Sequence, residues 1–178
     1  MKETPAEAAA ILAKGSEALD ALFSRLTRAA AEARGTIGGG AWSARDLAGH
    51  IETWEEVALR TIEDVRASRP PNIRNTVTDE ASLDLFNAVE VERKAARGWE
   101  EALTGFRATN ARLVATIRTI ADDDWERVAP GAEDERVRTF GEHIGSNTGM
   151  PAYPFRHAWA HLPDLEAFVQ AATEGPPT

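Results

Sequence analysis

The sequence contains no cysteine among its 178 residues. Disulfides, thiolate nucleophiles and cysteine-based zinc or iron–sulfur sites are therefore excluded. No run approaches the roughly 18 uninterrupted apolar residues that a membrane-spanning helix needs. The first 20 residues carry acidic side chains where an export signal would have its basic region, and charges interrupt what would be its apolar core. We therefore expect a cytoplasmic protein that does not act at a membrane.

Positive charge is also scarce, because 20 Lys and Arg face 29 Asp and Glu, for a formal net charge of −9. Nucleic acid binding depends on a basic surface, and no basic cluster stands out in the sequence. We therefore expect that nucleic acid is not a partner. A phosphate loop, a dinucleotide fingerprint and a Ser-His-Asp order are absent as well, so no organic cofactor site and no catalytic residue is assigned.

Sustained alternation of apolar and polar residues is missing, whereas alanine, the best helix former, is abundant. Apolar residues recur instead at spacings of three, four and seven, as on one face of a helix. These stripes predict an all-α fold, a four-helix bundle with connecting loops longer than those of an ideal bundle. The expected helical segments are residues 5–33, 43–69, a region from about 79 interrupted at Gly98, 99–120, and parts of 140–172, of which 155–172 is the clearest.

The whole chain fits one domain. We expect residues 1–173 to form a single bundle and the tail 174–178 to be disordered. Glycines 38–40 predict a flexible link, residues 70–78 and 121–139 predict loops, and the acidic run 122–124 predicts a solvated turn. Ser43 followed by Asp46 resembles a capping box at the start of the second helix.

Histidine is the residue type with the clearest chemical pattern. His157 and His161 are four residues apart and share one face of a helix, a spacing that lets two imidazoles bind one metal ion. His50 follows Leu47 by three residues and precedes Trp54 by four, so it lies along an apolar stripe. A facing helix would bring it to the pair, as metal sites in bundles are built. A histidine on an apolar face is also commonly a structural residue, and spacing alone leaves both interpretations open.

Two motifs carry a family resemblance. Residues 42–51 (WSARDLAGHI) resemble the second-helix signature of the DinB/YfiT-like superfamily, and residues 147–148 with 157–161 (HAWAH) resemble its final-helix pattern. The resemblance implies a four-helix bundle, usually a homodimer, with a divalent metal held by three side chains, here His50, His157 and His161. In the related mycothiol-dependent maleylpyruvate isomerases the middle ligand is an acid. Because His157 occupies that place, the match favours the three-histidine branch.

Imidazole ligands favour zinc or nickel when no thiolate competes. Three neutral imidazoles leave a coordination position open, so the site could activate water, as in a hydrolase, or a low-molecular-weight thiol, as in a thiol-dependent S-transferase or isomerase. We expect a small-molecule substrate in either case. One alternative is a non-catalytic dimeric bundle that binds or sequesters a small molecule, and another is an interaction module without metal. A purely structural site would be closed by a fourth ligand, for which His143 or a carboxylate is the candidate.

Two polar residues have open roles. Asp46 lies one turn before His50 and could orient an imidazole, or it could simply cap the helix. Asn110 falls on the apolar stripe of 99–120, where it could project into a cavity or form a hydrogen bond within the bundle.

Overall fold

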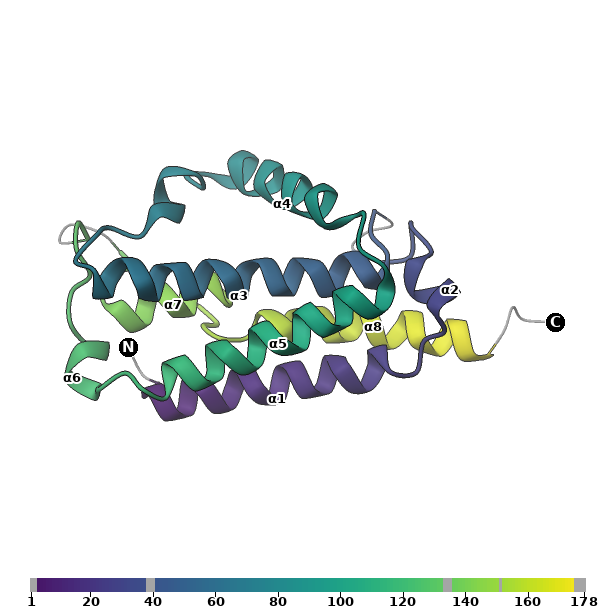
Figure 1. Cartoon of the computed structure of the whole chain (residues 1–178), viewed down its shortest axis with the longest axis horizontal. Coiled ribbons are helices and arrows are strands. Elements are labelled where there is room, and N and C mark those ends of the chain that lie inside the picture. The colour runs from purple at the N-terminus through teal and green to yellow at the C-terminus, as the bar shows by residue number, and fades with distance from the viewer. Residues whose placement is uncertain (1–2, 38–40, 133–135, 151, 175–178) are drawn as a thin grey trace.

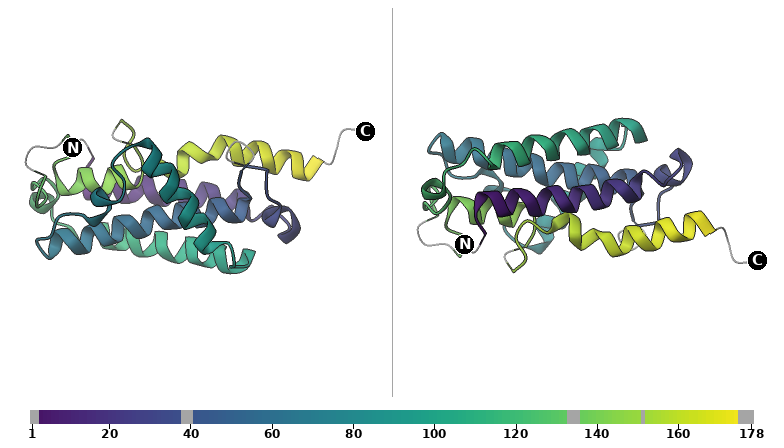
Figure 2. Two further views of the ribbon diagram at one scale, coloured as in Figure 1. Left: turned by 90° about the horizontal axis from the view of Figure 1, so that it is seen from above. Right: turned by 90° about the horizontal axis from the view of Figure 1, so that it is seen from below.

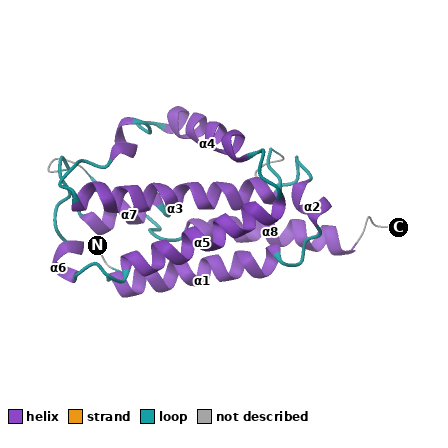
Figure 3. Ribbon diagram, in the orientation of Figure 1, coloured by secondary structure: helices purple, strands orange, loops and turns teal. Residues whose placement is uncertain are grey.

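The computed structural model describes residues 3–37, 41–132, 136–150 and 152–174. Helices account for all the regular structure of these residues, and the extended pairings among them are isolated bridges such as Ile37 with Trp42 (Figure 3). The expected all-α fold is confirmed. None of these helices is both long and apolar enough to cross a bilayer. The elements are α1 (Pro5–Phe23), α2 (Arg28–Glu32), α3 (Ala44–Arg66), the 3-10 helix η1 (Asn72–Asn75), α4 (Glu80–Lys94), α5 (Trp99–Ile117), α6 (Asp122–Trp125), α7 (Phe140–Asn147) and α8 (His157–Glu174).

Three long helices, α1, α3 and α5, lie side by side, and α7 and α8 follow one another along the fourth row of the bundle (Figures 1 and 2). Helix α3 packs against α5 and α7, and α1 packs against α5 and α8. The four-helix bundle expected from the stripes is therefore present, but its fourth row is divided in two. The core has two clusters, one including Leu113, Ile117 and Phe140 and the other including Leu47, Phe106 and Leu165.

Both the first residue and the buried face of helix α3 follow from local sequence patterns. Ser43 Oγ accepts a hydrogen bond from the Asp46 backbone N–H at 3.1 Å, and Asp46 Oδ2 accepts one from the Ser43 N–H at 3.0 Å. This reciprocal pair is the capping box that the sequence indicated. The apolar stripe is buried along the whole helix, at Leu47, Ile51, Trp54, Ala58, Ile62 and Val65.

The prediction of one helix over 5–33 is wrong, because α1 ends at Phe23 and α2 begins at Arg28. Ser24 Oγ donates back to the Asp20 carbonyl at 2.8 Å, and Thr27 caps α2 by accepting from the Ala30 N–H. Short hydroxyl side chains offer the backbone such alternatives to a continuing helix. Two other ends differ from expectation: α3 stops at Arg66 and α5 at Ile117, three residues before the expected ends.

Helix α4 crosses the outside of α3 obliquely rather than joining the bundle (Figure 2, left). Val89, expected on its buried stripe, is 55% exposed because α4 packs chiefly against α3. The segment expected as a loop over 121–139 contains the short helix α6, and α8 begins at His157 and continues past Pro163 to Glu174. The glycine link at 38–40 and residues 175–178 of the expected tail lie outside the described residues.

Candidate metal centre

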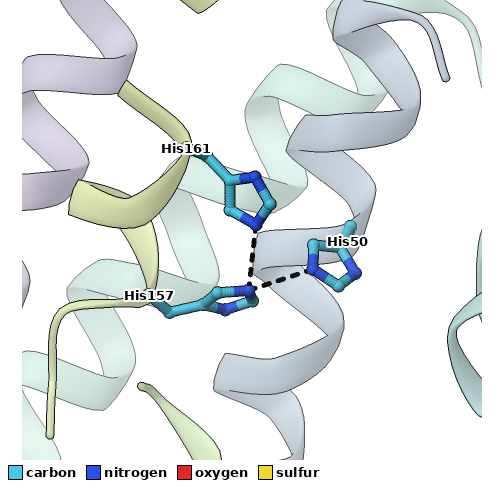
Figure 4. A group of neighbouring side chains, drawn as sticks. All are labelled: His50, His157 and His161. Atoms are coloured by element: carbon cyan, nitrogen blue, oxygen red, sulfur yellow. Dashed lines mark hydrogen bonds between the residues drawn. The ribbon is translucent and has the colours of Figure 1, made fainter. Parts of the chain in front are cut away.

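Three histidines from two helices meet beside the break between α7 and α8 (Figure 4). His50 Nε2 on α3 lies 3.0 Å from His157 Nε2, and His161 Nε2 lies 3.2 Å from the same His157 nitrogen. One ligand nitrogen from each of the three rings lies within 4.8 Å of the others. The structure therefore brings together the three residues that the sequence singled out.

The segment between α7 and α8 sets where the histidine pair begins. The His157 N–H donates to the Thr148 carbonyl at 2.9 Å, which closes the connection back onto the end of α7. Gly149 permits this path, because a Cβ there would collide with the Tyr153 carbonyl oxygen and would lie 2.8 Å from the Phe155 backbone nitrogen. Phe155 has a φ of 63°, a left-handed conformation that turns the chain into α8.

His50 is held from its own side of the site. It lies on the buried face of α3, whose start is fixed by the capping box, and the Trp42 ring packs against its imidazole with 4.6 Å between ring centroids. The ring of His157 meets that of His50 nearly edge-on at 4.7 Å. Packing therefore restricts the orientation of the imidazoles as well as their positions.

All three imidazoles are biased toward the neutral form. Burial lowers the pKa of His157 to about 3, and the nearby His161 ring adds to the shift. Burial also lowers the pKa of His50 well below its ordinary value, with contributions from His157, His161 and the Lys94 ammonium. The pKa of His161 is lowered by burial, against an opposing effect of Asp164. Neutral imidazoles carry the nitrogen lone pairs that a metal ion requires.

The donor set fits a divalent cation. A single ring nitrogen offers either one N–H or one lone pair, so His157 Nε2 is poorly suited to both of its close contacts as hydrogen bonds. One cation would accept a lone pair from each ring. Nitrogens bound to a tetrahedral zinc at about 2.0–2.1 Å lie about 3.3–3.4 Å apart, close to the distances found here.

No fourth ligand joins the group within the ranges that the structure describes. His143, the candidate for closing the site, is buried on α7 outside this group.

Asp46 is engaged in the capping box and in an ion pair with Arg45 at 3.1 Å, which supports its capping role. Asn110 Nδ2 donates to Glu55 Oε1 at 2.6 Å, so it forms a hydrogen bond within the bundle.

A cavity of about 800 Å³ opens beside the three imidazoles. This volume lies within the range of small-molecule sites in proteins. Its wall is built by α3, the segment from η1 to α4, the end of α7, the connection to α8 and the first turns of α8. The lining residues are His50, Trp54, Ile73, Val77, Leu83, Asn87, Val137, His143, Ser146, Asn147, Gly149, Met150, Tyr153, Arg156, His157, Trp159, Ala160 and His161.

Several residues of this wall were missed by the sequence reasoning. Trp54 Nε1 donates to Asn87 Oδ1 at 2.9 Å, which ties α4 to α3 at the cavity. Nothing in the local sequence marks Asn87, because the contact depends on how α4 crosses α3. Arg156 could have been noticed, since it immediately precedes His157 and is the last charged residue before the histidine pair.

Comparison with known proteins identifies the family. The model of the DinB superfamily matches residues 11–149, most of the chain, and the chain therefore belongs to that superfamily. His50 lies within the matched region, whereas His157 and His161 lie beyond it, so their association with His50 rests on the geometry above. No curated protein matches the chain.

Two solved structures share the fold. A crystal structure of an uncharacterised protein from Escherichia coli UTI89 superposes with a TM-score of 0.75 at 18% identity, covering 96% of this chain and 95% of that one. A crystal structure of the colibactin self-resistance protein ClbS in complex with a dsDNA has a TM-score of 0.71 at 16% identity, covering 93% of this chain and 97% of that one. At these identities the likeness establishes the fold alone.

The second of these structures corrects the expectation that nucleic acid is not a partner. A protein of this same fold was crystallised with double-stranded DNA. The exclusion was wrong because a net charge of −9 is a sum over the chain, whereas DNA binding depends on the charge of a local surface. The expected homodimer stays a prediction, because the structure describes a single chain.

Proposed function

We propose that this DinB-superfamily protein is a metal-dependent enzyme acting on a small molecule, with His50, His157 and His161 holding a divalent cation, zinc or nickel. One observation carries the proposal. Three neutral imidazoles converge on the wall of a cavity of about 800 Å³, and no fourth histidine or carboxylate among the described residues joins them. Structural zinc sites are closed by four protein ligands, whereas catalytic sites keep one position for water or substrate.

A divalent cation in this position would lower the pKa of a water or thiol beside it and so supply a nucleophile near neutral pH. The chain's own residues provide the surroundings. Trp54, Leu83 and Ile73 line the cavity with apolar surface that excludes water from a bound substrate. His143 is buried and lines the same cavity.

Two reaction classes remain within this proposal, and they differ in the need for a second substrate. A hydrolase would act on its substrate with water alone. A thiol-dependent S-transferase or isomerase would require a low-molecular-weight thiol. Activity of the metal-loaded protein on panels of esters, amides and electrophiles, measured with and without added thiol, separates the two classes.

The experiment that tests the proposal itself measures metal and activity together. Purified protein should contain about one zinc or nickel per chain by mass spectrometry, and His50→Ala should reduce both metal content and turnover. Protein that binds no divalent metal at micromolar concentrations would overturn the proposal. A metal-loaded protein that binds small molecules but turns none over would favour the alternative, a non-catalytic binding or sequestering bundle, which the apolar lining of the cavity also suits.

A further inference from the structure

The charge of the cavity wall is unusual for so acidic a protein. Among the residues whose side chains the structure describes, Arg156 is the only permanently charged one that lines the cavity, and none of the Asp, Glu or Lys residues in that set lines it. Most of the remaining wall is apolar or aromatic, formed by Trp54, Ile73, Val77, Leu83, Val137, Met150, Tyr153 and Trp159.

Arg156 is fixed in place by the turn into α8. Its carbonyl accepts the Ala160 N–H at 3.1 Å, and its Nη1 donates to the Pro154 carbonyl at 2.9 Å. The only carboxylate near its guanidinium within the described ranges is Glu3, whose Oε1 lies 3.4 Å from the same Nη1. Both contacts use Nη1, so Nε and Nη2 keep donors for another acceptor. The side chain is 40% exposed, and Glu3 does not line the cavity.

We infer that the cavity selects a small carboxylate with an apolar body, its carboxylate paired with Arg156 and its body against the aromatic and aliphatic wall. The guanidinium fork matches a carboxylate in geometry, and its attraction for an anion is stronger beside apolar surface than in water. A neutral ligand would leave the arginine unpaired on that side, and a cation would be repelled. The inference rests on the proposed function in that it names the substrate class of the same site.

The position of Arg156 also relates this anion to the imidazoles. Arg156 and His157 are consecutive, with Cα atoms about 3.8 Å apart, and both residues line the cavity. A carboxylate held at Arg156 would therefore place the rest of a small molecule beside the three histidines. Arg156 is in this sense a specificity-determining residue, which recognises the charged end of the substrate.

The test uses the metal-free full-length protein and two matched probes, 2-naphthoate and its neutral amide, 2-naphthamide, with binding measured by titration calorimetry. The wild type should bind naphthoate about tenfold or more tightly than naphthamide, as expected for a hydrogen bond between charged groups. Arg156→Gln should abolish this preference while leaving naphthamide binding unchanged. Glu3→Gln, which removes the competing carboxylate, should strengthen naphthoate binding severalfold.

Two further variants control for the loss of an arginine outside the cavity and for misfolding of Arg156→Gln. Arg127→Gln removes an exposed arginine that pairs with Asp124 at 3.4 Å and does not line the cavity, so it should preserve the preference. If Arg156→Gln fails to fold, Arg156→Lys serves instead and should weaken but not abolish the preference, because it keeps the charge and loses the fork. Equal binding of the two probes by the wild type, binding of neither, or a preference that survives Arg156→Gln would overturn the inference.

Metal content distinguishes this failure from failure of the proposed function. Selective naphthoate binding by a protein that never binds metal would refute the enzyme proposal and leave the anion site standing. A metal-loaded, active protein without the preference would refute the anion site alone.

Discussion

The carboxyl group of Glu55 on α3 is bound to the side-chain amide of Asn110 on α5, with 2.6 Å between Oε1 and Nδ2. Both residues are buried, and Glu55 Oε2 has no hydrogen-bond partner among the described residues. Burial raises the pKa of Glu55 to about 8, and the nearby Glu52 adds to the rise, while the Asn110 hydrogen bond and Lys94 oppose it. Helices α3 and α5 are therefore joined in the core by a carboxyl group that is largely protonated at neutral pH.

The Glu55 carboxyl should make stability fall as pH rises. Its pKa is higher in the folded chain than in the unfolded chain, so between about pH 4.5 and 8 the folded state binds the extra proton. Glu55→Gln, which stays neutral, should remove this slope and increase the free energy of unfolding at pH 8 by a few kcal/mol, since one pKa unit corresponds to about 1.4 kcal/mol. Urea denaturation of both proteins from pH 5 to 9 measures the difference. Parallel stability curves for the two proteins would contradict the assignment.

Metal binding should depend on the three clustered imidazoles and not on the fourth histidine. His157→Ala removes the ring that contacts both others and should weaken zinc affinity more than about a hundredfold, beyond the loss typical of an outer-shell partner. His143→Ala should leave metal content unchanged, because His143 lies outside the group. Competition with a chromophoric chelator gives the affinities, and circular dichroism checks helicity. Loss of metal in His143→Ala but not in His157→Ala would show that the site is assigned wrongly.

The turn before α8 should be as important to the site as the ligands themselves. Gly149→Ala places a Cβ against the backbone of Tyr153 and Phe155, so the connection must shift and His157 with it. We expect a melting temperature several degrees lower and reduced zinc affinity. Gly98→Ala is the control, because a Cβ there meets only the Arg28 side chain at 3.8 Å. Equal zinc affinity in the two variants would mean that this turn does not position the ligands.

The buried ion pairs of Lys94, the last residue of α4, should contribute more to the free energy of unfolding than an exposed ion pair does. Lys94 Nζ lies 3.0 Å from Glu52 and 3.3 Å from Glu56, and its side chain is buried. Lys94→Met should lower the free energy of unfolding by about 3 kcal/mol, because it leaves Glu52 buried with fewer partners. Arg93→Met removes an exposed pair with Glu90 and should cost less than about 1 kcal/mol. Chemical denaturation that gives equal losses would contradict this difference.

Local patterns in the sequence predicted the buried face and the start of α3 correctly. The spacing of Leu47, Ile51 and Trp54 predicted a buried face of α3, and Ser43 with Asp46 predicted its first residue, because periodicity and capping act over one or two turns. The break at Ser24 and Thr27 was missed since the apolar spacing continues across it. There the two hydroxyl groups outweigh helix propensity, and the sequence alone does not show which effect prevails.

By itself, therefore, the sequence determined the all-α class, the faces of the main helices and the pairing of His157 with His161 on one turn. Only the tertiary structure decided that His50 meets them across 107 positions of the chain. It also placed Arg156 on an apolar cavity and buried Glu55 against Asn110. The physical reason is range: helix periodicity is fixed by neighbours three and four residues away, whereas burial, cavities and pKa shifts depend on which faces of distant helices pack together.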